Sequence, residues 1–174
     1  EFLESLKDGD KKNLILVALD QIQDPHNLGA IARSAACLGA KALLLSERRS
    51  APVTAAAVQA SAGAIEKIPV IGAGNLAQAL AQLKEQGFWI YGADMSGTPS
   101  WSASFNAPMV LVIGSEGKGL RPLVLRSCAH VATLPPSGGD SVAALNASAA
   151  AAVLLYETKR QRSAPRAPGR RLGG

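Results

Sequence analysis

The first residues with the potential for chemistry are an asparagine and an arginine that follow the first apolar run of the chain. Asn27 lies in the segment DPHNLG, residues 24–29, and Arg33 comes six residues later, nearly two helical turns. We expect Asn27 to be the N-cap of a helix over 27–38, with Arg33 roughly on the same side of it. A helix N-terminus attracts phosphate, and a guanidinium can bind a phosphate or a ribose hydroxyl. On spacing alone, an ordinary capped helix with one surface arginine is the simpler interpretation.

A second candidate is the glycine-rich segment GSEGKG, residues 114–119, which follows the apolar run 109–113. Three glycines around one carboxylate allow the backbone to approach a ligand closely. The segment is not a P-loop, because the ending Gly-Lys-Ser/Thr is absent. Glu116 could orient a cation or accept a hydroxyl proton. A glycine-rich turn with a solvated glutamate is the simpler alternative.

A third candidate begins where the apolar run 129–134 enters a Pro/Gly loop, residues 135–140. We expect this loop to lead into a long Ala-rich helix over 141–162, which carries Asn146 near its start. An amide side chain in such apolar surroundings needs hydrogen-bond partners if it is buried. The partner of Asn146 could be a ligand or a backbone group.

These segments must be positioned by alternating strands and helices. Apolar runs predict strands at 14–19, 42–45, 67–71, 88–93, 109–113 and 129–134. Helical patterns lie between them at 27–38, 54–62, 75–86, 120–126 and 141–162, and 94–107 is expected to be a loop. Such units predict an α/β fold with a mainly parallel sheet and helices on both faces. Ligands of these sheets bind beyond the carboxyl ends of the strands, where the three candidate segments begin.

Charge is distributed unevenly along the chain. Six basic residues and no acidic ones occur from Lys159 onward, which leaves 12 basic and 13 acidic residues, a net charge of −1, in the rest. The basic end suits a polyanion such as RNA, although a solvated terminal extension would have the same composition. Aromatic residues make up only 4% of the chain and leave few platforms for stacking bases.

The two cysteines, Cys37 and Cys128, have neither CxxC spacing nor a neighbouring histidine. We expect two buried, reduced thiols and neither a disulfide nor a metal site. No apolar run approaches the ~20 residues that cross a bilayer, and no signal peptide is recognisable at the start, so a cytoplasmic protein is expected. The chain begins with Glu-Phe, which favours a fragment of a longer protein with an N-terminal extension or linker remnant at 1–13.

The three segments, in this order and at this spacing, resemble the three motifs of the SpoU branch of the SPOUT methyltransferases. The motifs correspond to 24–29 with Arg33, to 113–119, and to Leu134-Pro135 with 145–148. The resemblance extends over about 14–162, the implied catalytic domain, and leaves 163–174 as a basic flexible tail. It also implies a deep trefoil knot near the C-terminus, which no spacing argument would predict.

The resemblance implies an RNA 2′-O-ribose methyltransferase that uses S-adenosylmethionine and works as a homodimer. It implies that the cofactor is held largely by backbone groups, at Gly92, Ala93, Gly114, Glu116, Gly117, Leu134, Leu145 and Asn146. The acceptor would be a ribose 2′-hydroxyl, in 23S ribosomal RNA and on guanosine in preference to transfer RNA. No metal and no membrane are implied.

Arg33 of one subunit is implied to face the cofactor of the other subunit. We assign it to positioning the ribose and stabilising the developing alkoxide, since a free arginine rarely loses its proton. A role as the base remains open. Asn27 and Asn146 would hold Arg33 or the ribose, Glu116 would orient Arg33, and Ser141 is a further candidate for substrate binding. His26 could be a general base, but local packing is the simpler role.

Two departures from the family pattern affect the third motif. Ala144 occupies a position where relatives often have serine, and the loop 135–145 is two residues longer, through Gly139 and Asp140. Both changes lie close to Asn146, so they bear on how substrate is contacted there.

Two other functions compete with this interpretation. The segment GAGNLA, residues 72–77, matches the dinucleotide-binding pattern GxGxxA, and Asp94 lies 20 residues beyond Gly74. A small NAD-dependent enzyme is therefore the alternative. The pattern, however, usually belongs to the first strand and helix of such a domain. If it has no such role here, Asn75 is simply a helix N-cap and Asp94 a solvated loop residue. A non-catalytic RNA-binding module would explain the basic end but not the glycines around Glu116.

Overall fold

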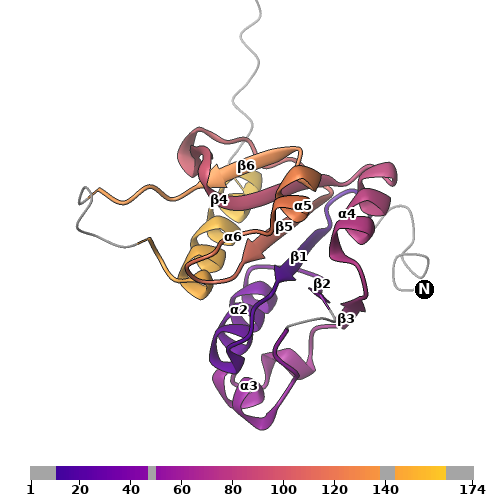
Figure 1. Cartoon of the computed structure of the whole chain (residues 1–174), viewed down its shortest axis with the longest axis vertical. Helices are drawn as coiled ribbons and strands as arrows, with labels where there is room; N and C mark the ends of the chain where they lie inside the picture. The colour runs from indigo at the N-terminus through magenta and orange to yellow at the C-terminus, as the bar shows by residue number, and fades with distance from the viewer. Residues whose placement is uncertain (1–10, 47–49, 138–143, 164–174) are drawn as a thin grey trace, which may run out of the picture.

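The computed structural model describes residues 11–46, 50–137 and 144–163, which form a parallel sheet flanked by helices (Figure 1). The strands are β1 (Ile15–Asp20), β2 (Ala42–Ser46), β3 (Val70–Ala73), β4 (Trp89–Pro99), β5 (Met109–Gly114) and β6 (His130–Thr133). The helices are α2 (Pro25–Cys37), α3 (Ala55–Ala60), α4 (Leu76–Glu85), α5 (Pro122–Ser127) and α6 (Ala147–Ser163), with 3₁₀ turns η1 (Ala64–Glu66) and η2 (Ser100–Ser102). The strand order is β3-β2-β1-β5-β4-β6, and every pairing is parallel.

Both faces of the sheet are covered, as predicted. Alternate residues of β1 point to opposite faces, so Val17 belongs to one buried cluster and Leu16 to another. The cluster around Val17 includes buried residues of α2, α3 and α6, whereas the cluster around Leu16 includes residues of α4 and α5. Two apolar cores on either side of one sheet explain why β1 and β5 are buried along their whole length.

The strand registers bring the ends of β1, β5, β4 and β6 to the same edge of the sheet. Asp20 pairs with Gly114, and Ala93 pairs with both Ile113 and Ala132. The chain runs from β1 outward to β3 and then crosses to β4 on the other side of β5. The loops that contain the three candidate segments therefore start from neighbouring strands.

Several elements have limits that differ from those predicted. β4 continues to Pro99, where a loop from 94 was expected, because Thr98 and Pro99 pair with β6 after an irregularity that begins at Ala93. The strand expected at 67–71 lies at Val70–Ala73, after the 3₁₀ turn η1. These differences arise from pairing with distant strands, which local sequence patterns do not report.

Helix starts are set by side chains that accept backbone hydrogen bonds. α2 begins at Pro25 with Asp24 as its N-cap, so the prediction that Asn27 is the N-cap was wrong; the Asp24 carboxylate accepts from the His26 amide at 3.0 Å. α6 begins at Ala147 and not at Ser141, since Asn146 Oδ1 accepts from the Ala149 amide at 2.8 Å. Asn75 is the N-cap of α4, as predicted.

Both cysteines are free thiols, but only one is partly shielded. Cys128 is half-buried, whereas Cys37 at the end of α2 is exposed, so its expected burial was wrong. Within 11–46, 50–137 and 144–163, no group of three or more His, Cys, Asp or Glu residues could hold a metal ion. No helix in these ranges is long and apolar enough to span a membrane.

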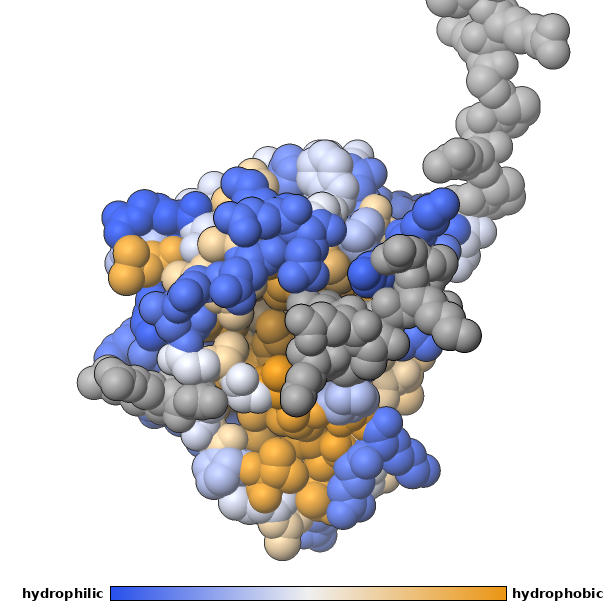
Figure 2. All heavy atoms as spheres, turned by 90° about the vertical axis from the view of Figure 1, so that its right-hand side faces the viewer, coloured by the Kyte–Doolittle hydropathy of each residue, from blue (hydrophilic) through white to orange (hydrophobic). Residues whose placement is uncertain are grey.

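The surface seen from the right-hand side of Figure 1 is divided by polarity. Figure 2 shows hydrophilic residues over most of the upper half of this face, at the height of α4 and α5. Apolar surface gathers in the lower half, at the height of β3 and α3. The expected knot stays a prediction. Residues 138–143, nearly all of the expected basic tail at 163–174 and most of the extension 1–13 lie outside the described residues.

Candidate functional site

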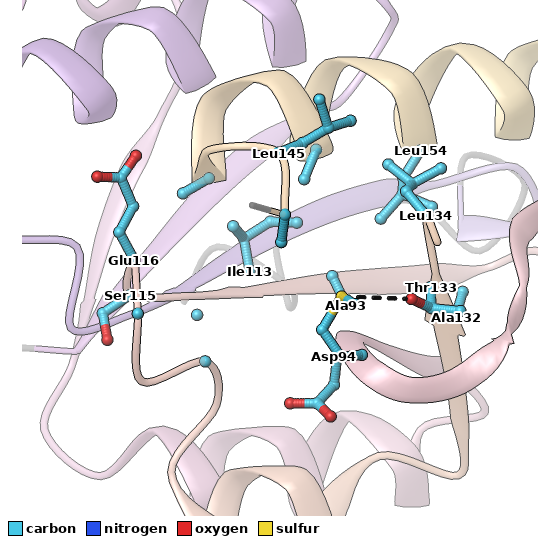
Figure 3. Close-up of a pocket in the computed structure, with 17 residues that line it drawn as sticks. Ala93, Asp94, Ile113, Ser115, Glu116, Ala132, Thr133, Leu134, Leu145 and Leu154 are labelled. Carbon is cyan, nitrogen blue, oxygen red and sulfur yellow. Dashed lines mark hydrogen bonds between the residues drawn. The ribbon is translucent and has the colours of Figure 1, made fainter. Parts of the chain in front are cut away.

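A cleft of about 200 Å³ lies at the carboxyl ends of β5 and β6, beside the irregularity of β4 that begins at Ala93, and the start of α6 covers it (Figure 3). Figure 3 shows Ser115 and Glu116 at one end of the cleft and Thr133 and Leu134 at the other. Its wall is formed by Ala93, Asp94, Met95, Ile113, Gly114, Ser115, Glu116, Gly117, Gly119, Ala132, Thr133, Leu134, Ala144, Leu145, Ala147, Ala150 and Leu154. This is the edge at which parallel α/β sheets bind ligands.

One wall of the cleft is a loop that folds tightly back on itself, residues 114–119, here called the glycine loop. The Gly119 amide donates to the Ser115 carbonyl at 2.9 Å, and Gly117 and Gly119 have φ of +78° and +66°. A Cβ atom at Gly114 would lie 2.3 Å from the carbonyl carbon of Gly119, so only glycine permits this approach. The wall therefore presents main chain to the cleft.

The rest of the cleft is apolar with an acidic contribution. Ile113, Leu134, Leu145 and Leu154 line it, and the charged side chains among its described lining residues are carboxylates, those of Asp94 and Glu116. Such a lining favours a ligand that is partly apolar and carries positive charge. It disfavours the two negative charges of a dinucleotide pyrophosphate.

Six of the eight residues expected to hold a cofactor meet in this cleft. They are Ala93, Gly114, Glu116, Gly117, Leu134 and Leu145. Gly92 is buried on the opposite side of β4, where a Cβ atom would lie 2.9 Å from Cys128 Sγ. Asn146 is exposed at the start of α6, where its side-chain oxygen also accepts from the Ser148 hydroxyl at 3.1 Å. Its amide nitrogen has no hydrogen-bond partner among the described residues.

The residues expected to act on the substrate lie outside the lining of this cleft. Arg33 is exposed on α2, and within the part of the chain that the structure describes it forms no ion pair or hydrogen bond. Asn27 is half-buried in the first turn of the same helix, and His26 beside it is exposed. No ion pair joins Arg33 to Glu116 within this subunit, and Ser141 lies outside the described residues. Ala144, which occupies a position where relatives often have serine, lines the cleft.

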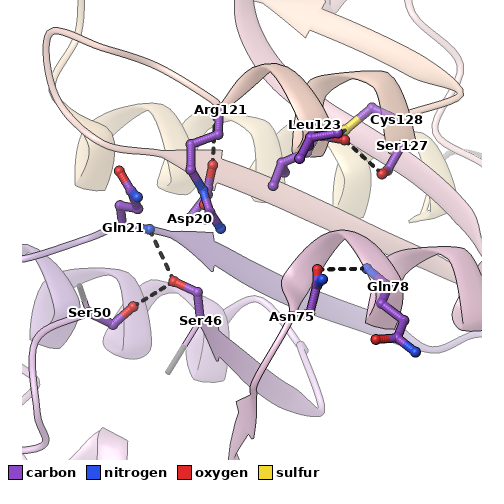
Figure 4. A network of polar contacts seen from close by, with 11 residues as sticks. Asp20, Gln21, Ser46, Ser50, Asn75, Gln78, Arg121, Leu123, Ser127 and Cys128 are labelled. Atoms are coloured by element: carbon purple, nitrogen blue, oxygen red, sulfur yellow. Dashed lines mark hydrogen bonds and ion pairs between the residues drawn. The ribbon is translucent and has the colours of Figure 1, made fainter. Parts of the chain in front are cut away.

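Sequence reasoning missed a buried ion pair beside the cleft. Asp20, the last residue of β1, is completely buried, and its carboxylate accepts from the Arg121 amide at 2.8 Å and from Arg121 Nε at 2.6 Å (Figure 4). An acidic residue that ends an apolar strand is the signal that could have identified it. Asp94, expected to be solvated, is partly buried in the cleft wall, where its Oδ1 accepts from the Ser96 amide and hydroxyl.

The same carboxylates influence a thiol behind the sheet. Burial, followed by the negative charges of Asp20 and Asp94, raises the pKa of Cys128 to about 12. The thiol donates to the Val124 carbonyl at 3.3 Å and packs below Gly92. Cys128 is therefore a neutral packing residue behind the sheet and not a nucleophile.

The dinucleotide-like segment does not contribute to the cleft. Gly72 lies within β3 at the edge of the sheet, and the Asn75 side chain accepts from the Gln78 amide to cap α4. Neither residue lines the cleft. The GxGxxA match is thus an ordinary connection between a strand and a helix.

Comparisons with known proteins agree with this geometry. The chain is 48% identical over 150 residues to an uncharacterized tRNA/rRNA methyltransferase of Synechocystis, covering 85% of the chain and 38% of that protein. It is 38% identical to the 23S rRNA (guanosine-2′-O-)-methyltransferase RlmB of Pseudomonas syringae, covering 95% of the chain and 66% of the relative. The chain spans about half the length of the curated relatives that it matches.

Solved structures show the same fold. A putative RNA methyltransferase of the TrmH family from Porphyromonas gingivalis superimposes with a TM-score of 0.78 at 35% identity, covering 86% of this chain and 60% of that one. The SpoU methyltransferase AviRb from Streptomyces viridochromogenes, in complex with the cofactor AdoMet, also gives 0.78, at 28% identity over 87% of this chain and 58% of its own. The model of the SpoU rRNA Methylase family matches residues 14–156, and the chain belongs to this family.

Proposed function

We propose that residues 14–162 form the catalytic domain of an RNA 2′-O-ribose methyltransferase that uses S-adenosylmethionine. The observation that carries the proposal is the cleft itself: a main-chain wall at the glycine loop, apolar side chains opposite it, and carboxylates at Asp94 and Glu116. The cleft lies at the strand ends of a SpoU family domain. Relatives of this chain are named as RNA methyltransferases, among them a guanosine-2′-O enzyme.

The residues of the cleft fit this cofactor. S-adenosylmethionine carries a cationic sulfonium and an ammonium group beside an adenosine, and it supplies an electrophilic methyl group when bound. Carboxylates attract its positive charge, and the leucine side chains can cover the adenine. Gly114 and Gly117 leave backbone groups within reach of its polar atoms. The proposed contacts with the cofactor are completed by Ala93, Glu116, Leu134 and Leu145, and Gly92 and Asn146 flank them.

The chain's own residues would align and activate the acceptor. Alignment in a fixed geometry can supply several kcal/mol of the lowering of the barrier. Arg33 of a second subunit would bind the RNA phosphate or the 2′-hydroxyl and stabilise the alkoxide as it forms. That Arg33 has no ion pair or hydrogen bond to the residues that the structure describes supports that assignment. Glu116 is exposed and accessible to such a neighbour.

Two asparagines and a serine would complete the substrate site. Asn146 uses its side-chain oxygen to cap α6, which leaves its amide protons for ribose or for Arg33. Asn27 would orient Arg33 from the same helix, and Ser141 would contact substrate. Ribosomal RNA with a guanosine acceptor is the favoured substrate, with transfer RNA as the alternative, because the Pseudomonas relative named for 23S rRNA covers nearly the whole chain.

Binding and transfer can be tested separately. Isothermal titration with S-adenosylmethionine and with NAD should show saturable binding of the first ligand alone. Transfer of labelled methyl groups to ribosomal RNA and to transfer RNA should then identify the acceptor, and mass spectrometry should locate a 2′-O-methyl group. Binding of NAD alone, or RNA binding without methyl transfer, would refute the proposal.

The assignment of Arg33 gives a sharper expectation. Arg33→Ala should bind S-adenosylmethionine as the wild type does, because the side chain does not line the cleft. Its turnover should fall by at least about a hundredfold, as expected when a positioned catalytic group is removed. Arg126→Ala, which removes an exposed arginine from α5, is the matched control. Unchanged turnover in Arg33→Ala would remove this residue from the mechanism.

A further inference from the structure

We infer that Asp20 is a positioning residue for the cofactor site, because its ion pair with Arg121 fastens the far end of the glycine loop to β1. The inference rests on the proposed function, in which the glycine loop is the main-chain wall of the cofactor site. Asp20 itself does not line the cleft and would not touch the cofactor. Its effect would be exerted through the position of the loop.

The glycine loop is attached to β1 at both of its ends. At its start, Gly114 is paired with Asp20 in the register between β5 and β1. Just beyond its end, Arg121 donates its backbone amide to Asp20 Oδ2 and its Nε to Asp20 Oδ1. A single carboxylate thus receives both the main chain and the side chain of one residue, which fixes its position and orientation.

Among the described residues, Asp20 is the side chain that accepts hydrogen bonds from Arg121. α5 begins at Pro122 with Arg121 as its N-cap position, and no side chain of its own caps it. Both hydrogen bonds that Arg121 donates go to Asp20, although the two residues are 101 positions apart in the sequence. Figure 4 shows the pair at the point where the chain leaves the glycine loop and enters α5.

The tight packing of the loop makes the position of Arg121 important for the cleft. Gly114 is so close to Gly119 and to the Leu120 amide that a Cβ atom would overlap both. Release of Arg121 would allow Gly119 and Leu120 to move away from Gly114, which would open the wall of the cleft. A buried ion pair contributes little net stability relative to apolar packing, so its main contribution here is to geometry.

The pair also connects two of the motifs. Asp20 is followed directly by Gln21, whose φ of +60° begins the turn toward the segment 24–29 and α2. The carboxylate therefore lies between the loop that would face RNA and the loop that would face the cofactor.

The test uses the full chain and two variants, Arg121→Ala and Asp20→Asn. S-adenosylmethionine affinity is measured by titration calorimetry, and hydrogen exchange is followed in the peptide that covers 114–121. We expect Arg121→Ala to weaken cofactor affinity at least about tenfold, because the displaced loop no longer holds its backbone groups against the cofactor. Exchange should accelerate in that peptide and stay unchanged in peptides from β2 and α4.

Control variants separate position from charge and from stability. Arg126→Ala removes the same charge five residues further on, within α5, and should leave affinity and exchange unchanged. Arg121→Lys keeps a cation beside Asp20 that Arg121→Ala lacks, so it should bind the cofactor more tightly than Arg121→Ala and less tightly than the wild type. Arg121→Ala leaves the completely buried Asp20 carboxylate without its cation, which is destabilising, whereas Asp20→Asn removes the buried charge itself. Denaturant unfolding of both variants therefore accompanies the titrations, and affinity is compared under conditions in which each variant is folded.

The outcomes distinguish this inference from the proposed function. If the wild type does not bind S-adenosylmethionine, the proposed function fails. If the wild type binds and Arg121→Ala binds as tightly, with normal exchange over 114–121, the role of Asp20 is refuted. Exchange that accelerates equally in every peptide would also refute it, since the pair would then serve global stability alone.

Discussion

At the scale of single residues, the two cysteines differ sharply in their surroundings. Cys37 is exposed at the end of α2, whereas Cys128 is half-buried, and burial together with Asp20 and Asp94 raises its pKa to about 12. Only a thiolate reacts rapidly with disulfide reagents. The native protein at pH 8 should therefore show one fast-reacting thiol, and a Cys37→Ser variant should show none.

The raised pKa of Cys128 also predicts how stability depends on pH. In the unfolded chain the thiol ionises near pH 9, but in the folded protein it stays neutral up to about pH 12. Its contribution is complete below about pH 9 and is lost as the pH rises toward 12, because only the unfolded state releases the proton. Between pH 8 and pH 10 the unfolding free energy of the wild type should fall by about 1 kcal/mol more than that of Cys128→Ala. Denaturant unfolding measures this, and Cys37→Ala should follow the wild type.

At the scale of elements, the contact between α2 and α3 depends on one glycine of the first motif. A Cβ atom at Gly29 would lie 2.4 Å from the Ala57 carbonyl oxygen and 2.7 Å from Ala60 Cβ. Gly29→Ala must therefore push α3 away from α2, even though alanine favours the helix itself. We expect the free energy of unfolding to fall by about 2 kcal/mol, the usual cost of overpacking.

Urea denaturation followed by circular dichroism would measure the effect of Gly29→Ala. Ala36→Ser, on the exposed side of the same helix, is the control and should change stability by about 0.5 kcal/mol or less. A Gly29→Ala variant as stable as the wild type would mean that the two helices can separate without loss of packing.

At the scale of the whole molecule, the proposed homodimer places each active site across a subunit boundary. Arg33→Ala removes the guanidinium but leaves the cleft intact. Gly114→Ala places a Cβ atom against the backbone of Gly119 and so disrupts the wall of the cleft. Each variant alone should be inactive. In a mixture with exchanged subunits, half of the dimers are mixed and each has one complete site, so about a quarter of wild-type turnover should return.

Differently tagged subunits would show that exchange has occurred. If Arg33 served the cleft of its own subunit, neither site of a mixed dimer would be complete, and the mixture would stay inactive. An inactive mixture with proven exchange would therefore place Arg33 and the cleft in one subunit.

Local patterns in the sequence were sufficient for the sheet, its covering helices and the loops that form the cleft. The apolar runs of β1 and β5 and the N-cap at Asn75 depend on neighbours within a few residues, and their predictions were confirmed. The glycines of 114–119 line the cleft, while their approach to a ligand stays a prediction. Periodicity and turn chemistry act over that range, so one sequence contains the information.

Tertiary structure decided the rest, because it depends on residues that are far apart in the chain. The extension of β4 requires pairing with β6, the packing of Gly92 requires Cys128, and the ion pair of Asp20 requires Arg121, 101 positions away. The start of α6 at Ala147, in contrast, is set locally. The capping hydrogen bond of Asn146 starts the helix there, although the Ala-rich composition predicted an earlier start. Composition and spacing can mark an acidic residue at a strand end, but only the folded chain identifies the arginine that it binds.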